Sequence, residues 1–178
     1  MSNQHNDETF AELAVPLLNS LYNFAHWLAR DATEAEDLVQ ETYAKALKGF
    51  ASFQLGTNFR AWMFRILRNT WLTSKTGLSA RMTVPMDEDT PEPADEKTPE
   101  SVLLDNIARA TVEKAIGDLP PPFREVLLLC DVEEMSYADI AQTLDIPIGT
   151  VMSRLSRARK AVREAVQGEW RAAEKSAR

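Results

Sequence analysis

Apolar residues recur every three or four positions along most of this chain, which is the spacing of one face of an α-helix. No stretch alternates apolar and polar residues for long, so β-strands are not expected. In the first helical pattern, from Phe10 to Leu28, Pro16 has no backbone N–H to donate and should kink or restart the helix. Further helices are expected at about 31–50, 58–75, 101–117, 123–132, 137–144 and 149–167. The pattern predicts an all-α protein.

Several residues mark where these helices begin and end. Thr33 and Glu36 have the spacing of a capping box, and Gly49 is expected to end the same helix. Ser136 and Asp139 form a second start of this kind. The prolines of "DLPPPF" can only precede or open the helix that follows them. The tail "EWRAAEKSAR" is expected to fray.

A break in the periodicity divides the chain. Residues 81–105 contain four prolines and eight acidic against two basic residues, and they account for most of the net charge of −7. Such a charged, proline-rich stretch is typical of a linker. The sequence therefore predicts two small helical domains, at 1–80 and 101–178, joined by an acidic flexible linker at 81–100. Because the linker dominates the total charge, the low pI does not argue against nucleic acid binding by either domain.

Cysteine and histidine usage limits the possible chemistry. Cys130 is the only cysteine, so no intramolecular disulfide can form, and its helical spacing with Phe123 and Val126 predicts a buried structural thiol. His5 and His26 are isolated, and no glycine-rich phosphate loop is present. We expect no catalysis, metal or cofactor. With neither a signal-peptide pattern nor an apolar run of about 18 residues, a soluble cytoplasmic protein is expected.

The segment "PIGTVMSRLSRARKAVR", residues 147–163, contains five basic residues and no acidic one. A short helix with an apolar face precedes it, and Asp145 stands where glycine is usual in the turn, which aspartate can also adopt. Thr150 is expected to cap the second helix. One arc of that helix should face the core, namely Val151, Leu155, Ala158, Val162 and Ala165. This is the pattern of a helix-turn-helix motif.

The opposite face of this helix suits the major groove of duplex DNA. Short polar side chains can approach base edges there, while cations neutralise phosphates. The candidate contacts are Thr150, Ser153, Arg154, Ser156, Arg157 and Lys160. A solvated amphipathic helix is the alternative interpretation, and the complete helix-turn-helix spacing from Ser136 to Leu155 argues against it.

A second candidate surface lies in "NFRAWMFRILRNTWLTSK", residues 58–75. One side of this helix is expected to face the core, with Phe59, Trp62, Met63, Ile66 and Thr70. The opposite stripe consists of Arg60, Phe64, Arg68, Trp71 and Lys75. Cations follow phosphates and aromatic rings stack on unpaired bases, so an exposed stripe of this composition fits single-stranded DNA. The alternative is that Phe64 and Trp71 pack against the first helix or the linker.

Four segments together carry a resemblance to a known family. They are "EAEDLVQETYAKALKGF", "NFRAWMFRILRNTW", "LPPPFREVLLL" and "MSYADIAQTLDIPIGTVMSRLSRARKAV". In their order, the chain resembles bacterial RNA polymerase sigma factors of the extracytoplasmic function (ECF) group, the minimal kind with only regions 2 and 4. Many relatives follow "NT" with a dense basic run, whereas "WLTSKTGLSAR" has two basic residues. This departure implies weak DNA affinity without polymerase.

The resemblance implies that the chain directs promoter-specific initiation by core RNA polymerase. The 101–178 domain would recognise the minus-35 element as duplex through the contacts given above. The 1–80 domain would capture the melted minus-10 strand with Phe53, Asn58, Arg60, Phe64, Arg68, Asn69 and Trp71. The residues implied to bind polymerase are Asp37, Gln40, Glu41 and Lys45. The implied partners are the β′ clamp helices and β flap of core polymerase, promoter DNA and an anti-sigma factor.

Two other functions remain open on the sequence alone. A transcriptional regulator of another class would bind a palindromic operator and use the N-terminal domain to sense or dimerise. A sigma-like interaction protein would sequester an anti-sigma factor without initiating transcription, and the stripe at 60–75 would then be dispensable. An enzyme is least expected, because the acidic cluster at 87–96 lies in a segment too flexible to hold a preorganised site.

Overall fold

The computed structural model describes the backbone of residues 2–77 and 99–176, with the side chains of residues 8–76, 107–173 and 175. These residues form helices and short connections and include no strand, so the prediction of an all-α protein is confirmed. The N-terminal elements are α1 (Ser2–Ala14), η1 (Val15–Leu17), α2 (Leu18–Ala29), α3 (Ala32–Gly49), η2 (Phe50–Ser52) and α4 (Phe59–Gly77). The C-terminal elements are α5 (Pro99–Gly117), α6 (Pro121–Leu127), η3 (Leu128–Val132), α7 (Tyr137–Leu144) and α8 (Ile148–Ser176).

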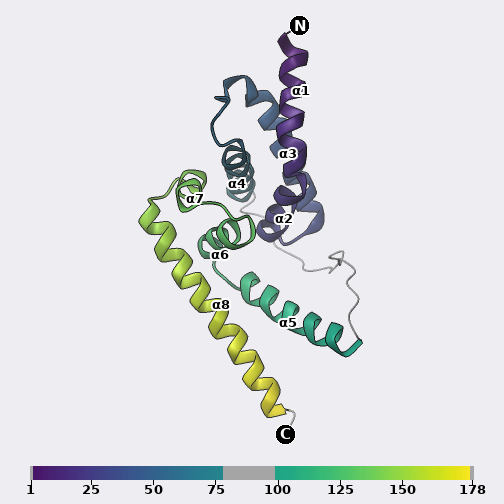
Figure 1. The fold of residues 1–178 in the computed structure, drawn as a ribbon, viewed down its shortest axis with the longest axis vertical. Coiled ribbons are helices and arrows are strands. Elements are labelled where there is room, and N and C mark those ends of the chain that lie inside the picture. Colours follow the sequence, from purple (N-terminus) through teal and green to yellow (C-terminus); the bar gives the residue numbers. More distant parts are fainter. Residues whose placement is uncertain (1, 78–98, 177–178) are drawn as a thin grey trace.

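The two groups of helices occupy different parts of the molecule. Figure 1 shows α1–α4 at one end, α5 and most of α8 at the other, and α6 and α7 between them. The predicted linker lies almost entirely in residues 78–98, outside the described residues. The domain bounds 1–80 and 101–178 stay a prediction.

The first helical pattern is interrupted at its proline, as predicted. Pro16 lies in the 3-10 turn η1, and α2 starts immediately afterwards at Leu18. The restart lets α2 pack along α3. Its buried residues are Leu21, Phe24, Ala25 and Leu28. Arg30 closes α2 in the left-handed conformation, with φ 59°, and its side chain is thereby free to reach other helices.

The start of α3 differs from the sequence prediction. Its N-cap is Asp31, whose carboxylate accepts the Glu34 N–H at 2.8 Å. The capping box expected of Thr33 and Glu36 is wrong, because both residues lie within the helix. An aspartate at the N-cap satisfies a free N–H and also interacts favourably with the positive end of the helix dipole. The helix ends at Gly49, as predicted.

Aromatic rings fix the loop that leads into α4. The ring centroid of Phe10 lies 5.2 Å from that of Phe50 and 6.0 Å from that of Phe59, both edge to face. Phe53 stacks on Phe50 and lies 4.9 Å from the Trp62 ring. Aromatic pairs of this kind contribute about 0.5–1.5 kcal/mol each beyond burial. The loop around Phe53 is therefore held by the N-terminal core at its aromatic residues.

The C-terminal helices are organised around a buried arginine. Pro121 opens α6, as the prolines of this segment predict, because the first turn of a helix needs no N–H. Three residues later, the Arg124 guanidinium donates to the carbonyls of Gly117 and Leu119, just where α5 ends. A cation at this position offsets the partial negative charge at a helix C-terminus. Arg124 thereby ties α6 to α5.

The N-terminal and C-terminal helices share one core. α4 packs against α7, and the buried apolar residues of both groups form a single cluster. The Thr143 hydroxyl of α7 donates to the Ala61 carbonyl of α4 at 3.4 Å. α4 is consequently covered by α3 on one side and by the C-terminal helices on another.

Candidate nucleic-acid interface

The turn between α7 and α8 has helix-turn-helix geometry. Ser136 is the N-cap of α7 and accepts the Asp139 N–H at 3.1 Å, as predicted. Asp145 closes α7 in the left-handed conformation, with φ 54° and ψ 50°, which is the conformation expected of the turn glycine it replaces. Ile140 and Leu144 are buried beneath the turn. The chain can therefore reverse direction into α8 without a glycine.

α8 turns a polar and basic face away from the core. Val151, Leu155 and Ala158 are buried, as predicted, whereas Ala165 is exposed, because the helix continues past the core. The exposed candidate contacts are Ser153, Ser156, Arg157 and Lys160, and those half-buried are Thr150 and Arg154. Lys160 lies 3.8 Å from Glu164. Within the described residues, Arg157 forms no ion pair.

Two expectations about the ends of α8 are wrong. The helix begins at Ile148, so Thr150 lies in its first turn and is not the N-cap. The Thr150 N–H donates to the Pro147 carbonyl at 2.9 Å, and its own carbonyl accepts the Ser153 hydroxyl at 3.1 Å. The tail expected to fray is helical as far as Ser176. Continuing helical hydrogen bonds and the Lys114–Glu169 ion pair with α5, at 2.8 Å, explain this extension.

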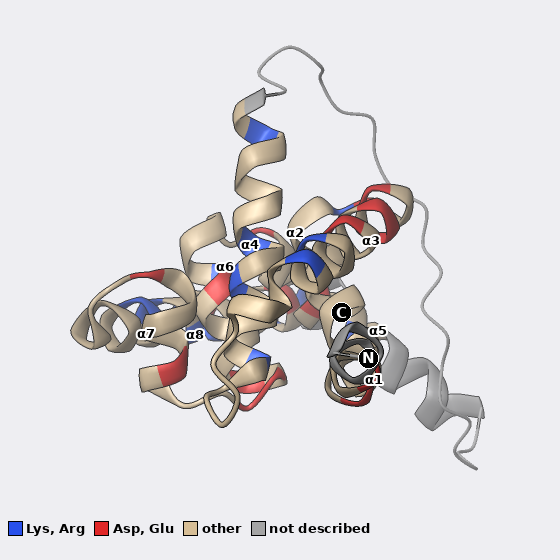
Figure 2. Ribbon diagram, turned by 90° about the horizontal axis from the view of Figure 1, so that it is seen from above, with Lys and Arg blue, Asp and Glu red and all other residues tan. Residues whose placement is uncertain are grey.

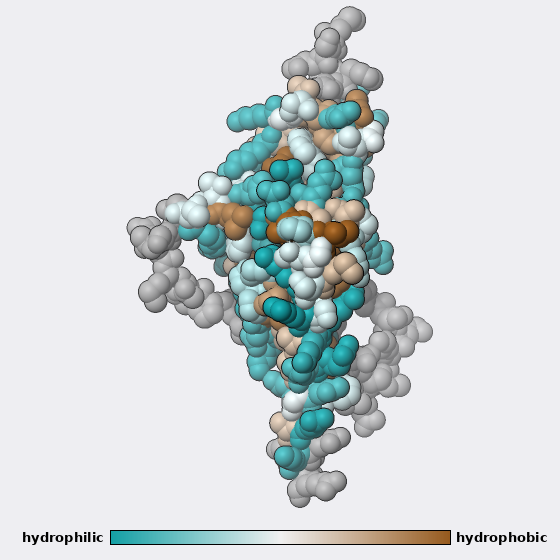
Figure 3. All heavy atoms as spheres, turned by 90° about the vertical axis from the view of Figure 1, so that its left-hand side faces the viewer, coloured by the Kyte–Doolittle hydropathy of each residue, from teal (hydrophilic) through white to brown (hydrophobic). Residues whose placement is uncertain are grey.

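A shallow hollow runs beside the outer face of α8. It has a volume of about 390 Å³ and is lined by Tyr137, Met152, Leu155, Ser156, Arg159, Lys160 and Arg163. Figure 3 shows this side of the molecule as mainly hydrophilic around a small hydrophobic area. Ile148 and Met152 are the exposed apolar side chains at the start of α8. The surface thus combines cations with apolar contact area, which suits phosphates and base edges together.

An ion pair orients α8 against the end of α6. The Arg159 guanidinium contacts both carboxylate oxygens of Asp131, at 3.1 and 2.5 Å. The hydrogen bond from Arg159 lowers the pKa of Asp131 below its ordinary value. The neighbouring Cys130 is half-buried, and burial followed by the Asp131 charge raises the pKa of its thiol. Cys130 is therefore protonated at neutral pH, but it is only half-buried, so the prediction of a buried thiol is wrong in this respect.

Asp131→Asn should lower the free energy of unfolding by about 0.5–1 kcal/mol at pH 7, since the pair is partly exposed. The carboxylate has a depressed pKa in the folded state, so its contribution is present above its unfolded pKa and is lost as the pH falls through the folded one. Urea unfolding at pH 7 and at about pH 3 tests this. A difference of the same size at both pH values would contradict the ion pair.

The candidate minus-10 residues do not form one open stripe. Phe64 is fully buried and meets Phe24 edge to face at 5.4 Å, so the exposure expected for Phe64 is wrong. Arg60 and Arg68 are half-buried, and both form ion pairs with glutamates of the C-terminal helices. The reason is that α4 is covered on two sides, which the pattern of a single helix does not reveal.

Other candidates near α4 remain accessible. Asn69 is exposed, and Asn58 is exposed while its side-chain oxygen accepts the Ala61 N–H at 3.0 Å. Phe53 is half-buried in the aromatic cluster. Arg65, which the sequence interpretation did not single out, is exposed four residues before Asn69 and hence on the same face of α4. The sequence feature that could have identified Arg65 is its position in "FRAWMFRILR", four residues before Asn69 and therefore on the same helical face.

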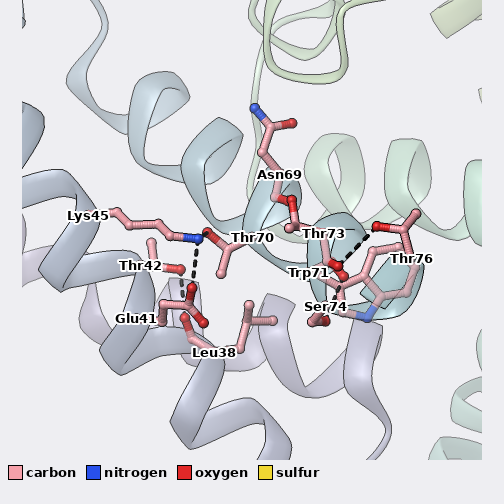
Figure 4. A network of polar contacts seen from close by, with 10 residues as sticks. All are labelled: Leu38, Glu41, Thr42, Lys45, Asn69, Thr70, Trp71, Thr73, Ser74 and Thr76. Carbon is pink, nitrogen blue, oxygen red and sulfur yellow. Dashed lines mark hydrogen bonds and ion pairs between the residues drawn. The ribbon is translucent and has the colours of Figure 1, made fainter. Parts of the chain in front are cut away.

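Trp71, in the second half of the candidate stripe, packs partly against the apolar core. Its indole Nε1 is buried and has no hydrogen-bond partner among the described residues. Figure 4 shows Trp71 on the last turns of α4, where Ser74 donates to the Trp71 carbonyl at 2.7 Å. Trp71 is half-buried. A buried indole N–H without a partner is costly, so a bound group that accepts from it would gain free energy.

The outer face of α3 is polar and open. Asp37, Gln40, Glu41 and Lys45 are all exposed, and Figure 2 shows acidic residues along this helix. Lys45 pairs with Glu41 at 2.7 Å and donates to the Thr70 hydroxyl of α4 at 3.3 Å (Figure 4). The candidate polymerase-binding residues therefore lie together on one face, braced against α4.

Comparison with known proteins identifies the two halves. The Sigma-70 region 2 family matches residues 13–80, and the Sigma-70, region 4 family matches residues 109–162. The RNA polymerase sigma-H factor of Pseudomonas aeruginosa is 37% identical over 162 residues, covering 85% of this chain and 80% of that protein. The ECF RNA polymerase sigma factor SigE of Mycolicibacterium smegmatis is 35% identical over 155 residues. The chain belongs to the ECF sigma factors.

The relatives also differ from this sigma factor in length. The match covers 86% of this chain but 60% of the M. smegmatis protein. Among solved structures, the sigma factor RpoE of Bartonella quintana, in a co-crystal with the anti-sigma factor NepR, has a TM-score of 0.75 and 29% identity. That match covers 90% of this chain and 98% of the other. Sigma factors direct promoter-specific transcription together with RNA polymerase and are transcription factors rather than enzymes.

Sequence analysis missed the buried charges of this sigma factor. Arg124, Glu125 and Glu133 are buried, and Arg30 reaches across to Gly117. The available signal was "FREVLLL", in which two charged residues interrupt an otherwise apolar run. Within the described residues, no group of three or more potential metal ligands gathers. In the same part of the chain, every helix is too short or too polar to span a bilayer.

Proposed function

We propose that this sigma factor directs core RNA polymerase to a promoter, with α8 recognising the minus-35 element as duplex DNA. The observation that carries the proposal is the outer face of α8, where Ser153 is exposed one turn before the exposed Ser156 and Arg157. Short side chains near the helix start let the backbone approach base edges, and the arginine that follows reaches bases or phosphates. The candidate contacts are Thr150, Ser153, Arg154, Ser156, Arg157 and Lys160.

The minus-10 strand would be captured by the other half of the molecule. The proposed residues are Phe53, Asn58, Arg60, Arg68, Asn69 and Trp71, whereas Phe64 is buried and is not among them. Phe53 lies at the loop surface against the aromatic cluster, where a flipped base finds a stacking partner. Asn69 is exposed on α4. The match of residues 13–80 to region 2 favours this function over a regulator that has only a helix-turn-helix motif in common with sigma factors.

Two further partners belong to the proposal. The open face of α3, with Asp37, Gln40, Glu41 and Lys45, would dock on the β′ clamp helices, and the C-terminal half would contact the β flap. Because this chain is similar to a sigma factor crystallised with an anti-sigma factor, an anti-sigma factor is proposed as a regulator.

Transcription with purified components tests the function. Core polymerase from the source organism, with and without this chain, is supplied with a pool of its genomic promoter fragments, and the transcripts are sequenced. We expect new start sites that require the chain and share a minus-35 and a minus-10 element. Tight binding of the isolated chain to a palindromic site, without any start that depends on the chain, would instead favour a transcriptional regulator.

Trp71→Ala should slow open-complex formation by about tenfold while changing duplex promoter binding little, because stacking on one base contributes about 1–3 kcal/mol. The measurement compares a closed linear promoter with the same promoter carrying a pre-melted minus-10 bubble. The matched control is Leu72→Ala, a similarly placed apolar residue on α4 that is exposed. Equal loss on both templates would remove Trp71 from strand capture.

A further inference from the structure

Two arginines of the proposed minus-10 surface are already occupied in this structure. Arg68 of α4 contacts Glu125 of α6 at 3.2 Å and donates to the Leu144 carbonyl at 3.3 Å. Leu144 is the last residue of α7, so the guanidinium also sits at the negative end of a helix dipole. A guanidinium held by these two acceptors is not free to contact DNA.

Arg60 is held in an ion pair in the same way, about two turns earlier on α4. It pairs with Glu133, which follows η3, and its Cζ lies 5.7 Å from the centre of the Phe64 ring. The Nε of Arg60 is buried without a hydrogen-bond partner in the described part of the chain. The contact therefore holds Arg60 with one donor unsatisfied, which is a cost that separation of the two halves would relieve.

The carboxylates on the other side of this contact are strongly buried. Glu125 is 3% exposed and Glu133 is 5% exposed. Burial raises the pKa of Glu125, and the charge and hydrogen bond of Arg68 oppose that rise. Arg154 and Arg124 also lower it, by a smaller amount. A buried carboxylate requires a cation or hydrogen-bond donors, and for both glutamates the ion-pair partner comes from α4.

Two further arginines also link the halves, in addition to the Thr143–Ala61 hydrogen bond. Arg30 donates to the Gly117 carbonyl at 2.7 Å, and Arg124 donates to the Trp27 carbonyl at 3.1 Å. Gly117 ends α5, and Trp27 lies in the last turn of α2. A side chain at position 117 would meet the guanidinium, since an added Cβ would lie 2.9 Å from the Arg30 Nη2. On each side of the boundary, an arginine thus donates to a carbonyl near the C-terminus of a helix in the other half.

We propose that, in the free protein, the C-terminal helices dock on the arginine face of α4 and occlude the minus-10 surface. This inference rests on the proposed function, because Arg60 and Arg68 can contact either the two glutamates or the minus-10 DNA strand, but not both at once. The docked arrangement keeps Arg60 and Arg68 on Glu133 and Glu125, and the halves must separate before the two arginines reach a DNA strand. The boundary combines the shared apolar core with buried ion pairs, and relative motion of domains is the usual expectation where a boundary contains such polar contacts.

Distances across the boundary test the docked state directly. Spin labels are attached at Lys48→Cys in α3 and Gln167→Cys in α8, both exposed positions, in a Cys130→Ala background. Pulsed electron paramagnetic resonance of the full chain should give one narrow distance distribution. Arg60→Glu should raise the ratio of open to docked molecules about tenfold, because it replaces a charge-assisted hydrogen bond with repulsion.

Charge exchange distinguishes a specific pair from a general loss of stability. Glu133→Arg alone should open the molecule as Arg60→Glu does, and the double variant should return the ratio to within about twofold of the parent. The matched control is Lys114→Glu, which breaks an exposed ion pair within the C-terminal helices and should leave the distribution narrow. A broad distribution in the parent, or no recovery in the double variant, would overturn the inference.

Salt provides a second measurement that does not require substitutions. Raising the salt concentration from about 0.05 to 1 M shortens the screening length several-fold and should broaden the distribution of the parent slightly, because buried pairs are screened much less than exposed ones. A distribution that stays narrow at both concentrations and in both single variants would contradict ionic docking. If the distance measurements contradict docking while the chain still directs transcription from promoters, only the occlusion is rejected. If the chain is docked but directs no transcription, the proposed function is rejected.

Discussion

Arg124→Ala should lower the free energy of unfolding by about 3 kcal/mol, or roughly a hundredfold in the folding equilibrium. The side chain is 7% exposed, and its guanidinium donates to carbonyls of Ile116, Gly117 and Leu119 in addition to that of Trp27. Burial lowers the pKa of Arg124, yet an arginine remains protonated at neutral pH. Alanine would remove four hydrogen bonds from a buried cation at once and would leave the Leu119 carbonyl without its donor, although the Gly117 carbonyl keeps Arg30 and the Ile116 carbonyl keeps the Leu119 N–H. Urea unfolding followed by circular dichroism measures the change.

The control for this prediction is an exposed arginine in the middle of α5. Arg109→Ala removes an exposed cation of α5 whose ion pair, with Glu113 at 3.6 Å, stays within the helix, and it should change stability by less than about 0.5 kcal/mol. Arg124→Lys should lie between the two, since lysine keeps the charge but has fewer donors in a different geometry. If Arg124→Ala and Arg109→Ala had the same effect, the four carbonyl contacts would not be stabilising.

Helix boundaries set by proline and glycine were predictable because these residues act through their own backbone. Pro16 interrupts the first pattern, Gly49 ends α3 and Pro121 opens α6, each without help from distant residues. Caps were less predictable. Asp31 and Thr33 are both good N-cap residues two positions apart, and the same apolar stripe of α3 is compatible with either start. The hydrogen bond that decides between them depends on how the chain leaves α2.

The surroundings of α4 could not be predicted from its own sequence. Helical periodicity separates a helix into faces, but it does not say what covers each one. Arg60 meets a residue 73 positions away, and Arg68 meets one 57 positions away. Phe64 was assigned to an open stripe because arginines flank it at i ± 4, yet the same pattern fits a helix held between two groups of helices. In α8, by contrast, the predicted outer face is open, because the helix packs on one side only.

Replacing Arg157 and Lys160 together with glutamate should weaken binding of a promoter fragment by the polymerase complex about a hundredfold, since lost contacts are compounded by repulsion from phosphates. Both side chains are exposed, so folding should be unaffected. Arg157→Ala alone then identifies the kind of contact. A phosphate contact predicts a uniform loss over sequences and a salt slope lower by about 1, whereas a base contact predicts a loss of about 1–3 kcal/mol at one base pair.

The matched control is Arg171→Glu, an exposed cation on the same helix that lies about 21 Å further along its axis than Arg157. It changes the charge of α8 in the same sense and should reduce affinity only through long-range repulsion, which physiological salt screens over this distance. Binding is measured on one linear promoter at several salt concentrations. If the double variant and Arg171→Glu weakened binding equally per charge, the outer face of α8 would act through its overall charge alone, and specific recognition by Arg157 would be excluded.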